Sequence, residues 1–205
     1  MRTMKAAVIY QAGGPEVLRI ESRPVPVPQP GEVLIAVKAF GLNRSELFTR
    51  QGLSPDVTFP RVLGIEAVGV VDDAPGNEFA SGDVVATATD GMGREFDGGY
   101  AKYTCVPARQ VQVLNTARGW EVLGAVPEML QTALGSLFKS LRLGAGERLL
   151  ASCFAGQITI SPQVSGEPSL QFWCGKVDES TNFEGLLSAA EINDIHRQRR
   201  WFEAF

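Results

Sequence analysis

The sequence has few of the residues that bind metals or form disulfides. Its 205 residues include three cysteines and one histidine. Cys105, Cys153 and Cys174 are widely spaced and form no CxxC pair, so the sequence predicts neither a disulfide framework nor a zinc knuckle. We expect three buried thiols, and we expect His196, near the end of the chain, to lie on the surface.

Long apolar runs and an excess of one charge are also missing. The formal net charge is -4, with acidic and basic residues interspersed, which argues against nucleic acid as the main partner. Residues 1–14 begin an alternating pattern with only a short apolar run, which fits neither a signal peptide nor a membrane span. We therefore expect a cytoplasmic protein without a membrane partner.

Most of the first 115 residues are typical of short strands separated by glycine and proline turns. Pro24–Gly31 alternates proline with valine and should be an extended crossing segment, although a ligand for SH3-like modules is an alternative. The pattern predicts a β-barrel or sandwich. The expected strands are Lys5–Tyr10 and Val17–Glu21, joined as a hairpin, then Glu32–Phe40, Arg61–Val71, Asp83–Thr89, Tyr100–Pro107 and Gln110–Leu114.

From Trp120 the apolar residues recur at helical spacing. Pro127 should divide this part into two consecutive helices, and a strand beginning in Glu147–Leu150 suggests the first step of an α/β unit. The glycines of Leu143–Gly146 precede that strand, so we interpret them as a helix stop and not as a phosphate loop. Gly91-Met-Gly93 lies between strands and is predicted to be a hairpin loop.

The segment Ala39–Asp72 gathers polar residues between two apolar runs. Glycines bracket Asn43, Glu46 and Glu66, so backbone turns could present these side chains together at the edge of a barrel. The same pattern also fits helix caps, or a surface ion pair between Glu46 and Arg50.

Six stretches of the chain carry a resemblance to a known family: MKAAVIYQAGGPEVLRI, PQPGEVLIAVKAFGLNRSELFTRQG, RVLGIEAVGVV, GDVV, EFDGGYAKY and VPEMLQTALGSLFKSLRLGAGERLL. In these stretches the chain resembles the medium-chain dehydrogenase/reductase superfamily, and specifically its zinc-free quinone oxidoreductase branch. The resemblance implies an α+β protein that is mainly β: a GroES-like, partly open β-barrel followed by helices and an incomplete Rossmann-type α/β segment.

The resemblance also implies a domain division. Residues 1–120 would form the GroES-like (alcohol dehydrogenase-like N-terminal) domain, and residues 121–150 would provide connecting helices and the first strand of the cofactor domain. Residues 151–205 resemble no part of the family and would replace most of the Rossmann domain. In this tail we expect a short strand within Ser169–Trp173 and a helix over Thr181–Phe205.

The reaction implied is NADPH-dependent hydride transfer to a small quinone or enone, without zinc. Where zinc-dependent relatives have Cys and Gly-His-Glu, this chain has Asn43 and Gly64-Ile65-Glu66, which lack the thiolate and imidazole ligands. By position, Asn43 and Glu46 resemble the polar catalytic pair. The residues expected beside the substrate or nicotinamide are Phe48, Glu66, Met129 and Thr132.

Other interpretations stay open. Thr132 could be a helix-surface residue, and the family's glycine-rich cofactor turn is missing after Leu150. The chain could therefore be a non-catalytic GroES-like binding or interaction domain, or an inactive fragment; a co-chaperonin-like ring subunit shares only the barrel. A homodimer is compatible with the family, and the sequence does not decide the oligomeric state.

Overall fold

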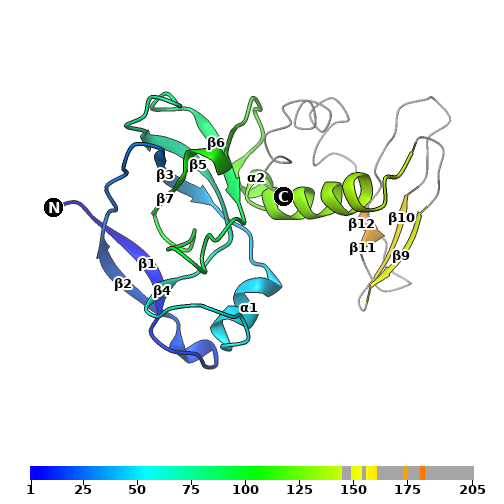
Figure 1. Ribbon diagram of the computed structural model, residues 1–205, viewed down its shortest axis with the longest axis horizontal. Coiled ribbons are helices and arrows are strands. Elements are labelled where there is room, and N and C mark those ends of the chain that lie inside the picture. The colour runs from blue at the N-terminus through cyan, green and yellow to red at the C-terminus, as the bar shows by residue number, and fades with distance from the viewer. Residues whose placement is uncertain (145–148, 154–155, 161–172, 175–180, 183–205) are drawn as a thin grey trace. The chain divides into compact units, whose positions relative to one another are not determined.

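The structure is a computed structural model (Figure 1) that describes residues 1–144 and the strand backbones of residues 149–153, 156–160, 173–174 and 181–182. The chain divides into two compact units, of which the first contains Met1–Thr132 and the second lies within Ala133–Arg199. No helix in the described ranges is long and apolar enough to cross a membrane.

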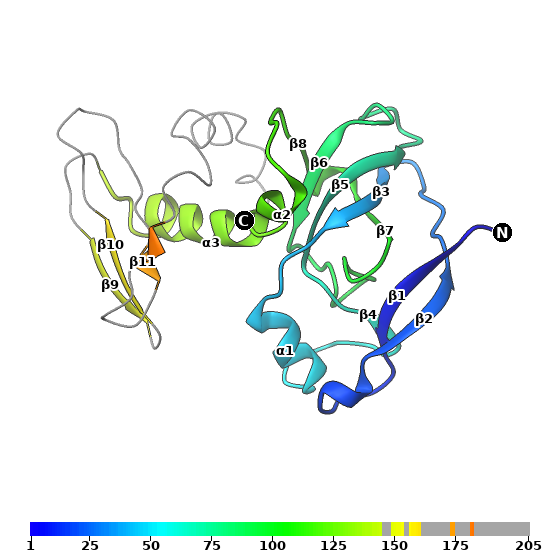
Figure 2. The same ribbon diagram turned by 180° about the vertical axis from the view of Figure 1, so that it is seen from behind.

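A curled five-stranded antiparallel sheet forms the main layer of the first unit, in the order β7-β3-β5-β6-β8 (Figures 1 and 2). This sheet, with short helices around it, confirms the predicted mainly-β fold with a partly open barrel. Its strands are β3 (Glu32–Ala39), β5 (Glu66–Asp73), β6 (Val84–Ala88), β7 (Tyr103–Pro107) and β8 (Val111–Val113).

A smaller sheet, β2-β1-β4, lies beside the five-stranded one. Its strands are β1 (Thr3–Ile9), β2 (Arg19–Pro24) and β4 (Arg61–Val62), and the 3-10 turn η1 (Pro15–Val17) closes the β1–β2 hairpin that the sequence predicts. The two sheets are joined where the N–H of Ala7 donates to the carbonyl of Tyr100 (2.8 Å). The segment Pro24–Gly31 crosses from the smaller sheet to the larger one. After Pro24 its residues belong to no strand, as expected of alternating prolines.

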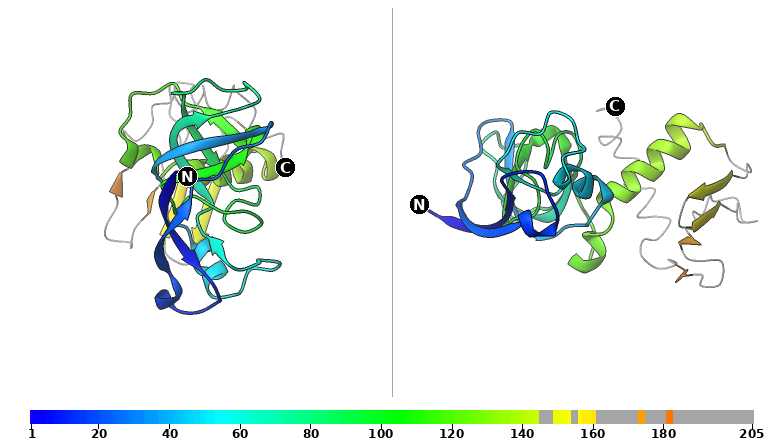
Figure 3. Two further views of the ribbon diagram at one scale, coloured as in Figure 1. Left: turned by 90° about the vertical axis from the view of Figure 1, so that its left-hand side faces the viewer. Right: turned by 90° about the horizontal axis from the view of Figure 1, so that it is seen from below.

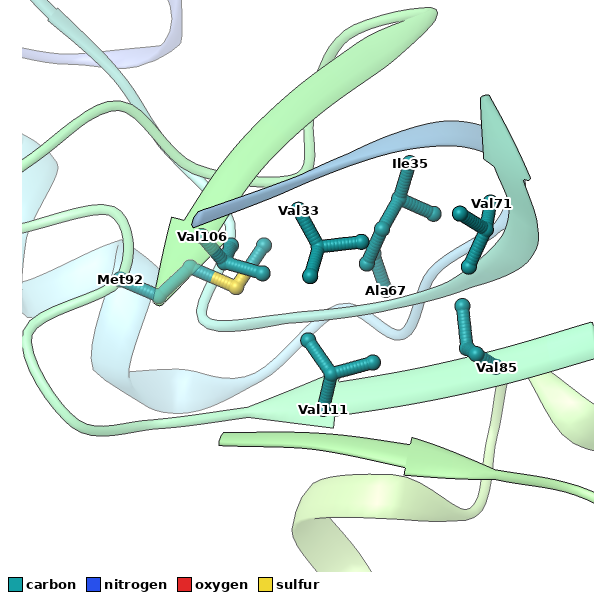
Figure 4. Close-up of a cluster of buried hydrophobic side chains, with 8 residues drawn as sticks. All are labelled: Val33, Ile35, Ala67, Val71, Val85, Met92, Val106 and Val111. Carbon is teal, nitrogen blue, oxygen red and sulfur yellow. The ribbon is translucent and has the colours of Figure 1, made fainter. Parts of the chain in front are cut away.

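The core of the first unit lies inside the curled sheet (Figure 4). Val33 and Ile35 of β3 point into it, while Leu34 between them packs into a second cluster under β1. Strand β3 therefore buries both faces, which explains its nearly continuous apolar sequence. The side chains of the first cluster are Val33, Ile35, Ala67, Val71, Val85, Met92, Val106 and Val111.

Short helices connect the strands and follow the barrel. They are α1 (Arg44–Arg50), the 3-10 turn η2 (Ala108–Gln110), α2 (Trp120–Leu123), α3 (Pro127–Leu134) and the π-helical turn η3 (Gly135–Ser140). The predicted division at Pro127 is confirmed, because α3 begins there.

Two predictions inside the barrel are wrong. The expected strand Arg61–Val71 is two strands, because Gly64 has a positive φ (107°) and turns the chain between β4 and β5. Gly91-Met-Gly93 is not a hairpin loop, because β6 and β7 are not neighbours: β3 and β5 lie between them. The turn residues were recognised correctly, but a turn does not specify which strands pair.

The second unit departs from the expected α/β pattern. Strand β9 (Leu149–Cys153) is present, but it pairs antiparallel with β10 (Gly156–Ile160); these are the two yellow strands of Figure 3. In the register of this pair, Cys153 lies opposite Gly156. A dinucleotide-binding unit would instead continue into a helix and return to a parallel strand. Strand β11 (Trp173–Cys174) pairs with β12 (Thr181–Asn182), so the helix expected over Thr181–Phe205 does not include its first two residues. Its remainder, with His196 and residues 169–172, lies outside the described residues.

Candidate active site

Asn43 and Glu46 form the capping box at the start of α1. Asn43 is the N-cap, and its backbone N–H donates to Oε2 of Glu46 (2.9 Å). The other oxygen of Glu46 accepts the N–H of Ile65 (3.0 Å), just before β5. Glu46 is 4% exposed, so its carboxylate serves two backbone donors inside the protein. Of the alternatives left open by the sequence, the helix cap is the one observed, while Arg50 donates to the carbonyl of Gly13 (2.6 Å).

Glu66, the first residue of β5, connects the start of α1 to the start of α3. Its Oε1 accepts from Nδ2 of Asn43 (2.7 Å) and its Oε2 accepts the backbone N–H of Glu128 (2.8 Å). Glu128 is the second residue of α3, so its N–H has no partner within the helix and a carboxylate there is electrostatically favourable. Glu66 is 2% exposed. We use the name polar network for the group formed by Asn43, Glu46, Glu66 and Glu128.

Burial controls the protonation of this network. Desolvation raises the pKa of Glu46 and of Glu66 above the ordinary value, and the hydrogen bonds that each carboxylate accepts oppose the increase. The charges of Glu128 and Glu46 raise the pKa of Glu66 further. Tyr100 is also affected, because burial first, and then the adjacent Glu46, raise its pKa, which keeps its hydroxyl protonated.

Two glycines leave room for the network. A Cβ at Gly41 would meet Oε1 of Glu66 and lie 3.2 Å from the carbonyl oxygen of Gly124. A Cβ at Gly64 would lie 2.7 Å from the ring of Tyr100, and the φ of Gly64 itself disfavours a side chain. The sequence suggested turns at both glycines, but not that they keep space for a carboxylate and an aromatic ring.

Phe48 and Met129, which the resemblance places beside the substrate or nicotinamide, lie on the two helices that Glu66 connects. Phe48 of α1 is 45% exposed and Met129 of α3 is 40% exposed, so both side chains are accessible. Thr132, one turn after Glu128, donates from Oγ1 to Oε1 of Glu128 (2.8 Å). The hydroxyl thus has a partner in its own helix, as the surface interpretation of Thr132 expects.

Three residues of the site were not among the sequence candidates. Tyr100 stacks against Phe40 with ring centroids 4.7 Å apart, next to Glu46. Glu128 enters through its backbone N–H, for which a sequence gives no signal. Gln131 donates from Nε2 to Oγ1 of Thr89 (3.1 Å) and ties α3 to the end of β6. Of these, only Tyr100 could have been noticed, as an aromatic residue directly after Gly98-Gly99.

A metal ion and a dinucleotide each require a particular arrangement of groups. Among the described residues, no group of three or more His, Cys, Asp or Glu side chains is placed to hold a metal ion. A dinucleotide needs a helix N-terminus directly after the first strand of its domain. Here two residues separate β9 from its antiparallel partner β10, so the described residues do not fit the pyrophosphate of a nicotinamide dinucleotide.

Cys105 is the free thiol whose side chain the structure describes, and it adds no nucleophile to the site. Cys105 is free and half-buried, and its pKa is raised to about 12, first by burial and then by Glu32. It is therefore protonated at neutral pH. The side chains of Cys153 and Cys174 lie outside the described residues.

Known proteins resemble the chain over the barrel and somewhat beyond. The family model of the alcohol dehydrogenase GroES-like domain matches residues 29–116. The quinone oxidoreductase of Pongo abelii is 30% identical over 164 residues, which cover 78% of this chain and 48% of that protein. The human quinone oxidoreductase gives the same identity and coverage. The chain thus spans about half the length of these relatives.

Solved structures resemble the same part of the chain. An NAD-dependent alcohol dehydrogenase superposes with a TM-score of 0.65 at 32% identity, covering 70% of this chain and 49% of that one. A mycobacterial structure complexed with NADPH has a TM-score of 0.62 at 29% identity, covering 70% and 44%. Together with the curled sheet and the helices that follow it, these similarities show an alcohol dehydrogenase GroES-like domain in this chain and support its place in the medium-chain dehydrogenase/reductase superfamily, in the quinone oxidoreductase-like branch.

Proposed function

We propose that the chain provides the substrate side of a reductase site for a small quinone or enone, with the nicotinamide cofactor held outside the described residues, which do not fit its pyrophosphate. The observation that carries the proposal is the polar network, in which Glu66 holds the amide of Asn43 between the starts of α1 and α3. The family assignment supports it, since the relatives include proteins named quinone oxidoreductase.

In this proposal Asn43 is the residue that touches the substrate. One N–H of its Nδ2 group can donate to Glu66, which leaves the second N–H for the carbonyl oxygen of a quinone or enone. A donor fixed in advance stabilises the negative charge that develops on this oxygen during reduction. Phe48 and Met129, both accessible, would provide the apolar wall for the ring of the substrate.

Glu46 has a positioning role in the proposal. Both of its oxygens accept backbone N–H groups, one from Asn43 and one from Ile65, so it fixes the N-cap geometry from which the amide of Asn43 projects. Thr132 would act through Glu128, whose carboxylate it contacts. The family resemblance also predicts use of NADPH, operation without zinc, a homodimer and the division into residues 1–120, 121–150 and 151–205. The cytoplasmic location is a prediction from the pattern of residues 1–14.

The experiment is a titration of the full chain with NADPH, followed by nicotinamide fluorescence, and then an assay of NADPH oxidation with 2-cyclohexenone. We expect saturable binding and enone-dependent oxidation. Absence of binding at millimolar NADPH would contradict a reductase role for this chain and favour the non-catalytic binding domain.

Asn43→Ala tests the proposed donor, and Asn115→Ala, at an exposed asparagine outside the network, is the matched control. Loss of one preorganised donor should lower kcat about 100-fold in Asn43→Ala. The control should keep the activity of the unchanged chain. Equal kcat values for the two variants would remove Asn43 from the catalytic machinery.

A further inference from the structure

A separate cavity of about 440 Å³ lies in the first unit, between the β2-β1-β4 sheet, the 95–98 loop and strand β7. Its walls include Met4, Val62, Phe96 and Tyr103, which are apolar or aromatic. No residue of the polar network lines it. Its size falls within the range of about 300–1,000 Å³ that is usual for small-molecule sites.

Two polar groups of the cavity-lining residues are buried without a hydrogen-bond partner among the described residues. They are Nε of Arg61 and Oγ1 of Thr104, and Thr104 is 2% exposed. An unsatisfied buried donor costs about 1–3 kcal/mol, so such groups are rare unless a ligand or water completes them. Both groups can donate to the same kind of atom, an oxygen that accepts hydrogen bonds.

The ion pairs at the cavity are long, which leaves their guanidinium groups open to a better acceptor. Arg61 lies 3.3 Å and Arg23 lies 3.9 Å from the carboxylate of Asp97, and Arg23 also lies 3.4 Å from the carboxylate of Glu21. Two other ion pairs of the same unit are shorter: the N–O distances are 2.7 Å in Arg2–Asp72 and 2.6 Å in Arg109–Asp90. These are normal lengths for a charge-assisted hydrogen bond. The two arginines at the cavity are therefore only partly satisfied by Asp97.

We propose that this cavity is a second binding site, for a small apolar or aromatic molecule with one carboxylate group. The carboxylate would accept from Nε of Arg61 and Oγ1 of Thr104, and its apolar body would contact Met4 and Phe96. Glu95 and Asp97 also line the cavity and balance the two arginines, so a monoanion is favoured over a phosphate dianion.

The binding is non-covalent. Cys105 also lines the cavity, but burial raises the pKa of its thiol to about 12, and the residue is therefore not a nucleophile at neutral pH.

Benzoate is the probe that tests the site, with benzyl alcohol as its neutral counterpart. We would titrate the full chain with each and follow backbone amide signals by NMR. We expect saturable benzoate shifts centred on Ala101, Tyr103 and Thr104, and binding of benzyl alcohol at least tenfold weaker. Equal affinities, or benzoate shifts centred on Asn43 and Glu66 instead, would overturn the proposal.

Thr104→Val removes the hydroxyl at nearly constant volume. We expect it to weaken benzoate binding at least fivefold and, because it removes an unsatisfied buried group, to raise the thermal midpoint of the unliganded chain. Thr87→Val is the control: Thr87 is equally buried, lies outside the cavity, and accepts from Nε2 of Gln110 (3.2 Å). It should lower the midpoint and leave benzoate affinity unchanged. Unchanged benzoate affinity in Thr104→Val would exclude the proposed site.

Discussion

At the scale of single residues, the buried glutamates Glu46 and Glu66 determine how the site is held together. Each carboxylate accepts two hydrogen bonds, and each is nearly removed from water. Burial raises both pKa values despite these bonds, so desolvation is the larger effect. Ionisation of these two carboxyl groups therefore lowers the free energy of unfolding, and the hydrogen bonds of the network offset only part of this loss. Because ionisation depends on pH, the loss does too.

We predict that Glu66 makes the chain less stable as the pH rises. Its folded pKa is raised above the ordinary value of 4.5, so the stabilisation by its bound proton is fully present below pH 4.5 and is lost as the pH rises through the folded pKa. Glu66→Gln should cost about 1–3 kcal/mol, because its amide group places a donor against Asn43 or Glu128. That cost should shrink as the pH rises.

Urea unfolding at several pH values measures the effect. The control is Glu78→Gln, at an exposed glutamate, whose free energy of unfolding should follow that of the unchanged chain at every pH. If the cost of Glu66→Gln instead grew with rising pH, the pKa of Glu66 in the folded chain would have to be lowered, and the dominance of desolvation would be refuted.

At the scale of elements, the turn between β4 and β5 places Glu66. Gly64 has a φ of 107°, and a Cβ there would lie 2.8 Å from the backbone nitrogens of Gly99 and Tyr100. These two atoms belong to the backbone, which cannot move aside as a flexible side chain can, and the ring of Tyr100 lies equally close, at 2.7 Å. The turn therefore requires glycine for two reasons: the dihedral angle and the space.

We predict that Gly64→Ala lowers the free energy of unfolding by about 3 kcal/mol or more, from backbone strain and steric overlap together. Gly31→Ala is the matched control, because Gly31 also has a positive φ (88°) but no atom lies within 4 Å of an added Cβ. It should cost only about 1–2 kcal/mol. Equal losses in the two variants, measured by chemical denaturation, would show that crowding at Gly64 contributes nothing.

Some of these elements could be predicted from the sequence and others could not. The β1–β2 hairpin and the break at Pro127 were predictable, because a glycine turn or a proline acts on its immediate neighbours. The contact between Glu66 and Glu128 joins residues 62 positions apart through a backbone N–H, and no local pattern encodes it. The same applies to strand order: Gly91-Met-Gly93 identified a turn, but the neighbours of β6 are set by packing over the whole sheet.

At the scale of the molecule, the order β7-β3-β5-β6-β8 gives the first unit an interior and two edges. Strand β5 is hydrogen-bonded to β3 on one side and β6 on the other, and it begins with Glu66. The site is therefore anchored at the end of the most enclosed strand, whereas β8 has a partner only in β6. A rigid strand that carries a site keeps the hydrogen-bond donors of the site in place during binding.

We predict that amide hydrogen exchange of the full chain is slowest in β5 and at least about 100-fold faster in β8, equivalent to a difference of about 3 kcal/mol in opening free energy. Strand β5 opens only when two ladders separate, while β8 is released by breaking one. Mass spectrometry or NMR of exchange in deuterated water measures both strands in one sample. Similar rates in β5 and β8 would mean that the sheet opens as a single unit, in which case Glu66 would gain no special rigidity from its place in the central strand.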